Sequence, residues 1–91
     1  MEAGNFILYI STNHPASIAA EAMLRNICNE YLEDNCTIKV VDIDKEPDEA
    51  EIAGILAIPT LLRTSPAPKI RIIGALSIKS RVLAGLGIVA S

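Results

Sequence analysis

Ninety-one residues are enough for one small domain, so the whole chain, 1–91, is expected to fold as a single unit. Hydrophobic residues make up 51% of the sequence and aromatic residues only 3%, which predicts a folded protein with an aliphatic core. The net charge of −3 argues against nucleic acid as a partner, because phosphate backbones attract basic surfaces. No apolar run approaches the roughly 20 residues that span a bilayer, and Glu2 stands where a secretory signal carries a basic residue. A cytoplasmic protein without membrane contact is therefore expected.

The first half of the chain predicts two strands with a helix between them. The run FILYI at residues 6–10 is apolar throughout and too short for a helix, which is typical of a strand buried on both faces. Pro15 suits the first turn of a helix that extends to about Leu32. The segment CTIKVVDI, at residues 36–43, is rich in β-branched residues and indicates the second strand. Strand, helix and strand predict a parallel, right-handed βαβ unit. The apolar stripe of the helix is expected to consist of Ala20, Met23, Leu24, Ile27 and Tyr31.

A second helix is expected to begin at Pro47, with Ile52, Ile55 and Leu56 at helical spacing. The carboxylates around its start suit a helix N-terminus. They do not fit a calcium loop, because Pro47 stands where that loop needs glycine. The single His14, with Cys28 and Cys36 eight positions apart, supplies too few ligands for zinc, so neither a metal nor a cofactor is expected.

The rest of the chain predicts a hairpin and a last helix. The segments IPTLLRT, residues 58–64, and KIRIIG, residues 69–74, resemble strands, and the prolines of the SPAP connection exclude a helix between them. They are expected to pair antiparallel. Ser77 is expected to cap a final helix. The apolar face of this helix would contain Ile78, Val82, Leu83 and Leu86.

This β-α-β-α-β-β-α order, with Pro59 at the start of the third strand, resembles the thioredoxin fold. The resemblance implies a cis peptide bond between Ile58 and Pro59.

Thioredoxin-like redox enzymes carry C-x-x-C between the first strand and first helix, whereas residues 11–17 here read STNHPAS. Without a thiolate there is no nucleophile for disulfide exchange. His14 as a general base has no evident nucleophile to activate, and a cap or turn explains Asn13, His14 and Ser17 at least as well. A non-enzymatic protein is therefore expected.

A series of motifs lies along most of the chain at fixed spacing: KVVDI, ILAIPTL around Pro59, Pro66 and Pro68, then RIIGALS and VLAGLGI, with LYISTNHPAS before them. Together these motifs resemble those of the KaiB family of small clock proteins, in which LYISTNHPAS corresponds to the end of strand one. Where the family has an acidic residue after Gly74, this chain has Ala75.

The resemblance implies a regulator that binds the ATPase ring of a KaiC-like, RecA-type hexamer. It also implies two further clock components as partners or competitors: KaiA, and a histidine kinase with a KaiB-like sensor domain. It also implies two folds: a thioredoxin-like monomer that binds the ring, and a tetramer whose second half is rearranged. The alternation at residues 69–73 favours the thioredoxin-like form, as a monomer or weak dimer.

The residues expected to influence this switch are Pro59, Pro66, Pro68, Gly74 and Ala75. Lys39, Lys69 and Arg71 are candidates for contact with an acidic partner surface, although charged residues at a strand edge also deter aggregation. Two alternatives remain. One is a stress-response paralogue with another partner, and the other is a thiol-transfer enzyme, resembling glutaredoxin or glutathione transferase, that uses Ser11 or Ser17.

Overall fold

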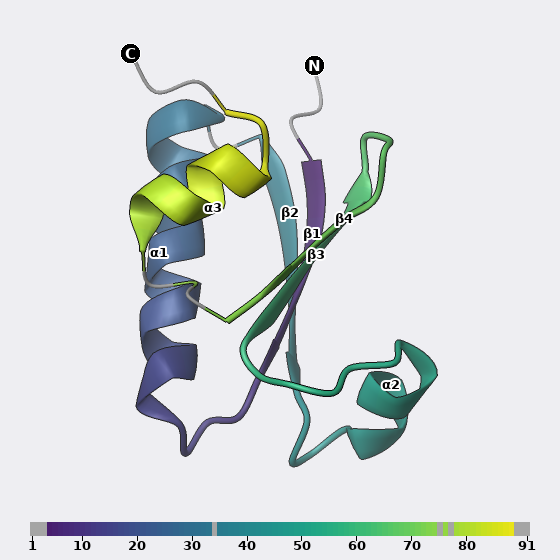
Figure 1. Ribbon diagram of the computed structural model, residues 1–91. Coiled ribbons are helices and arrows are strands. Elements are labelled where there is room, and N and C mark those ends of the chain that lie inside the picture. The colour runs from purple at the N-terminus through teal and green to yellow at the C-terminus, as the bar shows by residue number, and fades with distance from the viewer. Residues whose placement is uncertain (1–3, 34, 75, 77, 89–91) are drawn as a thin grey trace.

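The structure, a computed structural model, describes residues 4–33, 35–74, 76 and 78–88. The elements alternate in the predicted order β-α-β-α-β-β-α, as Figure 1 shows. Their bounds are β1 Gly4–Ile10, α1 Pro15–Tyr31, β2 Cys36–Asp42, α2 Pro47–Ile52, β3 Thr60–Ser65, β4 Ile70–Ile73 and α3 Lys79–Gly85. In the part of the chain that the structure describes, no helix has both the length and the apolar character needed to cross a membrane.

One four-stranded sheet has the order β2-β1-β3-β4. Strands β1 and β2 are parallel, which confirms the predicted βαβ unit. Strand β3 pairs antiparallel with β1, with Leu8 opposite Leu61, and β4 pairs antiparallel with β3, with Leu61 opposite Ile72. The predicted hairpin is therefore confirmed, and β1 lies in the middle of the sheet, where an apolar strand covered on both faces belongs.

Helices α1 and α3 lie on one face of the sheet and α2 lies toward the opposite face (Figure 1). The core is concentrated between the sheet and the α1–α3 layer, and its side chains are aliphatic apart from Phe6 and the small Cys28. Alternate residues of β1 face this layer, as the pleat of a strand requires. The buried cluster comprises Phe6, Leu8, Ile10, Ala20, Leu24, Ile27, Cys28, Leu61, Leu76, Val82, Leu83 and Leu86.

Helix α1 agrees closely with the prediction. Pro15 is at its first turn, and Ala20, Leu24 and Ile27 are buried along one side, while Met23 and Tyr31 are half-buried beside them. The helix ends near the expected position, where the Leu32 backbone N–H donates to the Cys28 carbonyl. A regular stripe at three- and four-residue steps was sufficient to predict which face of α1 is buried.

Helix α2 is shorter than predicted, because it ends at Ile52 rather than continuing through Ile55 and Leu56. Gly54 has φ +69°, a conformation that favours glycine. Its N–H donates to the Glu51 carbonyl at 3.0 Å, and the Ile55 N–H donates to the Ala50 carbonyl at 2.9 Å. These two bonds form a Schellman motif, which closes a helix and turns the chain away from its axis. Ile52 and Leu56 therefore do not share a buried helical face.

Helix α3 follows the prediction at its C-terminal end and differs at its start. Val82, Leu83 and Leu86 are buried, but Ile78, predicted on the same face, is the N-cap residue and is 45% exposed. Ser77, the predicted cap, lies outside the described residues. Arg63 holds the other end of the helix, since its guanidinium donates to the Leu86 carbonyl at 3.2 Å.

A charged contact joins α1 to α3. The Lys79 ammonium donates a hydrogen bond to the Glu30 carboxylate and lies 5.0 Å from the centre of the Tyr31 ring. The hydrogen bond to Glu30 is the main cause that raises the pKa of Lys79, and the contact with Tyr31 adds to it. Because both side chains are partly exposed, this ion pair contributes little to the stability of the fold.

Candidate partner-binding surface

Pro59 lies beside the carboxyl end of β1. The register pairs Tyr9 with Thr60, so the residue before Thr60 comes next to the end of β1 and the turn that leads into α1. The Ile58–Pro59 bond is cis, which confirms the expectation from the thioredoxin resemblance. This is the corner where thioredoxin-like redox proteins carry their cysteines, and residues 11–17 of this chain hold none.

The polar side chains of this corner serve the turn itself. His14 is the N-cap of α1, and its Nδ1 accepts a hydrogen bond from the Ala16 N–H at 3.2 Å. The hydroxyl of Ser17, whose side chain is fully buried, accepts from the Ser11 N–H at 3.1 Å. The Ser11 hydroxyl donates to the Asp44 carboxylate at 2.5 Å, which ties the end of β1 to the segment after β2. These contacts support the interpretation of the residues as a cap and turn.

Replacing Ser17 with Ala is expected to lower the free energy of unfolding by about 1–3 kcal/mol, because the half-buried Ser11 N–H loses its acceptor. Urea unfolding followed by circular dichroism measures this change. Ser80→Ala is the matched control, since Ser80 is exposed on α3 and its loss is expected to change stability by less than about 0.5 kcal/mol. Equal effects of the two substitutions would contradict the assigned role of Ser17.

An apolar surface lies around the end of α2. Ile52 is 87% exposed and Leu56 is 99% exposed, although both are large aliphatic side chains. Beside them is a shallow pocket of about 310 Å³. It is lined by Ile43, Pro47, Ala50, Glu51, Gly54, Ile55 and Leu56. We call the exposed side chains of Ile52 and Leu56, together with this pocket, the α2 patch. Apolar surface left in water next to a pocket is typical of an interaction site.

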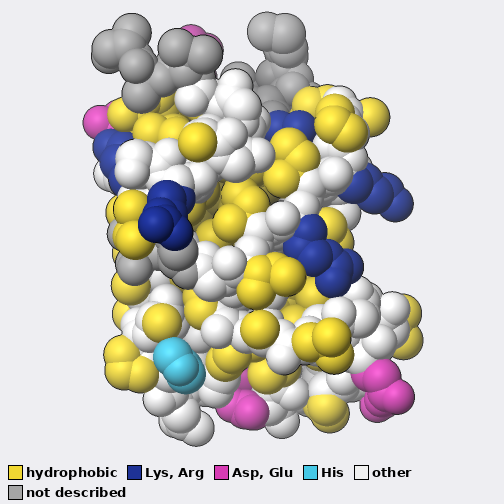
Figure 2. Space-filling model, in the orientation of Figure 1, with side chains coloured by type: hydrophobic (Ala, Val, Ile, Leu, Met, Phe, Trp, Pro, Cys, Tyr) yellow, Lys and Arg dark blue, Asp and Glu magenta, His cyan; other side chains and the backbone are white. Residues whose placement is uncertain are grey.

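Acidic residues surround one side of the α2 patch. Asp48 and Glu49 are in the first turn of α2, and Asp44 and Glu46 precede it. On the face drawn in Figure 2, acidic side chains lie at the lower edge, including near α2, and others lie at the upper left, while basic and hydrophobic side chains lie between these two levels. A partner for this patch would therefore combine apolar side chains with basic ones.

Two of the three predicted partner-binding residues hold α2 against the sheet. The Lys39 ammonium on β2 forms an ion pair with Glu49 at 3.1 Å. The Arg71 guanidinium on β4 donates to the carbonyls of Ala53 at 2.9 Å and Gly54 at 3.3 Å, just after the end of the helix. Lys69 is exposed and immediately precedes β4. The structure thus brings Lys39 and Arg71 to opposite ends of α2, and their contact with a partner stays a prediction.

The predicted switch residues lie at the two ends of the β3–β4 hairpin. Gly74 has φ +67°, and its N–H donates to the Pro59 carbonyl at 3.1 Å, so the two residues close one end together. Pro66 and Pro68 are in the connection at the other end, and both of their peptide bonds are cis, which the sequence did not predict. Ala75 lies outside the described residues. An influence of these residues on a change of fold remains a prediction.

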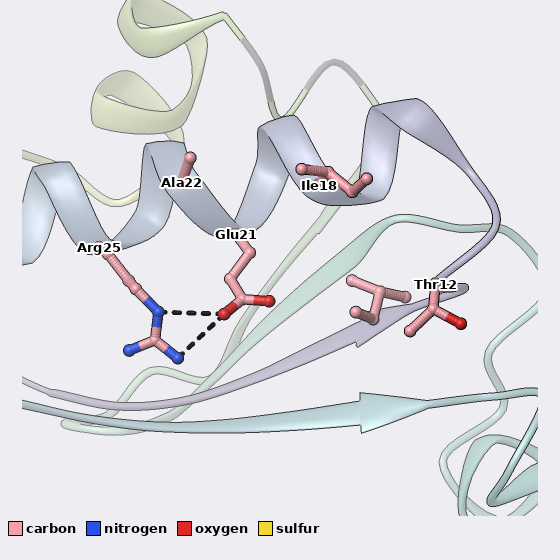
Figure 3. A pocket seen from close by; sticks show the side chains of 6 residues that line it. Thr12, Ile18, Glu21, Ala22 and Arg25 are labelled. Carbon is pink, nitrogen blue, oxygen red and sulfur yellow. Dashed lines mark hydrogen bonds and ion pairs between the residues drawn. The ribbon is translucent and has the colours of Figure 1, made fainter.

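A second hollow lies beside α1. Figure 3 shows Ile18, Glu21, Ala22 and Arg25 along the helix, with Thr12 on the preceding turn. Glu21 and Arg25 form an ion pair of 3.1 Å across one helical turn, so their charges satisfy each other. Among residues 4–33, 35–74, 76 and 78–88, no three His, Cys, Asp or Glu side chains come together as metal ligands would.

The sequence did not predict the α2 patch, because Ile52 and Leu56 were expected on a longer, buried helix. Gly54 is the residue in the sequence that could have indicated the early end of α2. A glycine two residues after the last apolar residue of a short helix is a common C-terminal stop, and everything after it leaves the helical period.

Comparison with known proteins supports both the fold and the family. Among solved structures, the chain is similar to chloroplastic thioredoxin z, with a TM-score of 0.78 at 17% identity over 94% of this chain and 77% of the other. It is also similar to the N-terminal domain of Synechococcus elongatus SasA, with a TM-score of 0.75 at 15% identity over 94% and 81% of the two chains. At such identities the likeness concerns the thioredoxin-like fold alone.

The sequence relatives are more specific. The chain is 43% identical, over 79 residues, to circadian clock oscillator protein KaiB1 of Synechocystis sp., a match that covers 87% of this chain and 75% of the relative. A similar match, at 44% identity over 79 residues, covers 87% of this chain and 76% of circadian clock oscillator protein KaiB of Nostoc punctiforme. The family model described as the KaiB domain matches residues 7–88. From its thioredoxin-like architecture and these matches, the chain belongs to the KaiB family.

Proposed function

We propose that this protein is a non-enzymatic regulatory subunit that binds a KaiC-like, RecA-type ATPase ring and modulates its timing activity. The observation that carries the proposal is the α2 patch, since Leu56 is 99% exposed beside a pocket in a chain whose relatives are clock oscillator proteins. An exposed aliphatic side chain gains free energy when a partner covers it.

The corner of the fold that performs chemistry in thioredoxin-like enzymes favours binding over catalysis here. Residues 11–17 contain no cysteine, and Ser11, His14 and Ser17 are engaged in hydrogen bonds within the turn. The Ser17 side chain is fully buried, and neither serine hydroxyl supplies the thiolate that disulfide exchange requires. Ser11 and Ser17 therefore favour a structural role, and the thiol-transfer alternative receives no support from these contacts.

Binding to a purified KaiC-like hexamer tests the proposal. The labelled chain is titrated with the hexamer in the presence of ATP or ADP, and fluorescence anisotropy reports the affinity. We expect saturable binding that depends on the nucleotide. A second titration includes KaiA or the kinase with the KaiB-like domain, and competition or joint binding is the expected result. Absence of binding in both nucleotide states would contradict the proposal and favour a paralogue with another partner, such as one that acts in stress response.

The proposed binding form is the thioredoxin-like monomer or weak dimer. The hairpin of β3 and β4 supports it, because a rearranged second half would place different residues opposite β1. Sedimentation velocity is expected to give a species of one or two chains. A stable tetramer with helical chemical shifts across residues 60–74 would contradict this expectation and identify the alternative fold as the resting form.

A further inference from the structure

Cys28 and Cys36 face one hollow from two different elements. Cys28 is near the end of α1 and is 4% exposed, whereas Cys36 is the first residue of β2 and is half-buried. Both line a hollow of about 260 Å³ that opens to the solvent. Arg25, Asn29 and Ile38 complete its lining. The hollow lies on the same side of α1 as the pocket in Figure 3, because Arg25 borders both.

The strand directs Cys36 toward the helix. Along the start of β2, Cys36 and Ile38 are half-buried while Thr37 and Lys39 are exposed, so the side chain of Cys36 is on the helix-facing side. Cys36 packs against the buried cluster that contains Cys28. Between the two cysteines, the Leu32 N–H donates to the Cys28 carbonyl and the Asn35 N–H donates to the Leu32 carbonyl. Cys28 and Cys36 therefore reach the same hollow from α1 and from β2.

We propose that Cys28 and Cys36 are a peroxide-sensitive pair that forms a reversible disulfide within one chain. The more accessible Cys36 reacts first: its thiolate attacks one oxygen of the peroxide, the O–O bond breaks, and Cys36 becomes a sulfenic acid as water leaves. The Cys28 thiolate then attacks the Cys36 sulfur, the S–O bond breaks, and a second water leaves with the disulfide formed. Two thiols are oxidised and one peroxide is reduced to two waters.

This site is separate from the α2 patch and does not depend on the proposed partner. The disulfide would close the loop from residue 28 to residue 36 and tie α1 to β2, which are both parts of the βαβ unit. In a reducing compartment such a bond is transient, because exchange with a cellular thiol reduces it to two thiols while that reductant forms a disulfide of its own. The proposal therefore assigns an oxidation response to the βαβ unit, which is separate in sequence from the β3–β4 hairpin.

Intact-protein mass spectrometry of the full chain tests the pair. After hydrogen peroxide treatment and alkylation with N-ethylmaleimide under denaturing conditions, the expected product has lost two hydrogen atoms, carries no alkyl group and migrates as a single chain. Dithiothreitol is expected to restore two alkylation sites. Peptide mapping is expected to recover the peptides of Cys28 and Cys36 joined. Two alkylated cysteines after peroxide, or disulfide-linked dimers, would overturn the proposal.

Two single variants test the order of the steps. In Cys28→Ser, we expect a sulfenic acid at Cys36 that dimedone traps, because no second thiol is present to resolve it. In Cys36→Ser, the buried Cys28 is expected to react with peroxide at least tenfold more slowly. Equal dimedone labelling of both variants would overturn the assignment of Cys36 as the first to react. Circular dichroism shows whether each variant is folded, and the wild-type mass measurement stands if one is not.

Discussion

Ile27→Ala is expected to lower the free energy of unfolding by about 2–5 kcal/mol, the largest effect of any single change considered. Ile27 is 0% exposed and belongs to the cluster that joins α1 to the sheet. Truncation to alanine removes buried methyl and methylene groups and leaves a cavity that the surrounding side chains fill only in part. A domain of this length has a total stability of about 5–14 kcal/mol, so the loss is a large share of it. Urea unfolding with linear extrapolation measures the change.

Two further variants separate cavity formation from a general effect of mutating α1. Ile27→Val keeps most of the side chain and is expected to cost about 0.5–1.5 kcal/mol. Ile18→Ala removes an isoleucine from the same helix, but Ile18 is 65% exposed, so we expect a change of less than about 0.5 kcal/mol. A loss for Ile18→Ala as large as that for Ile27→Ala would show that α1 does not bury the face that carries Ile27.

The double variant Ile52→Ser, Leu56→Ser is expected to weaken binding to the KaiC-like hexamer by about tenfold or more per side chain. Each substitution removes an aliphatic side chain whose burial against the partner is worth about 1.5–3 kcal/mol. The melting temperature is expected to stay within a few degrees of wild type, because both side chains are almost fully exposed in the isolated chain. The combination of lost affinity and retained stability is the diagnostic result. Fluorescence anisotropy and thermal unfolding on the same samples measure the two quantities.

Ile78→Ser is the matched control for that experiment. Ile78 is also an exposed isoleucine, at 45%, but it is the N-cap of α3, and serine is a favourable N-cap residue. We expect unchanged affinity and unchanged or slightly higher stability. If Ile78→Ser weakened binding as much as the double variant, the α2 patch would not be the contact surface.

Lys39 and Arg71 show how far the sequence reached toward the candidate site. Their positions in strands were predicted correctly, and the alternation along each strand indicated that they face away from the core. Their contacts with Glu49, Ala53 and Gly54 were not predictable, because these depend on where α2 lies relative to the sheet. The alternation along a strand shows which way a charged side chain points. The residue that this side chain contacts lies on another segment, and its position depends on how that segment packs.

The order of the elements, the buried face of α1 and the antiparallel hairpin could all be predicted from the sequence. Period-two and three-to-four-residue patterns are local, and they survive in the fold because each element must bury one side. Pro59 was assigned a cis bond through resemblance, and the structure agrees.

Which apolar side chains remain exposed, and which polar groups contact each other, depends on how the elements pack in three dimensions. The Schellman motif at Gly54 ends α2 early, and this single left-handed residue exposes Leu56. Similarly, Cys28 and Cys36 come to line one hollow, because α1 and β2 both pack on the same buried cluster. Hydrophobicity predicts that a side chain gains from burial, but burial also requires that another element lie over it, and that depends on the path of the whole chain.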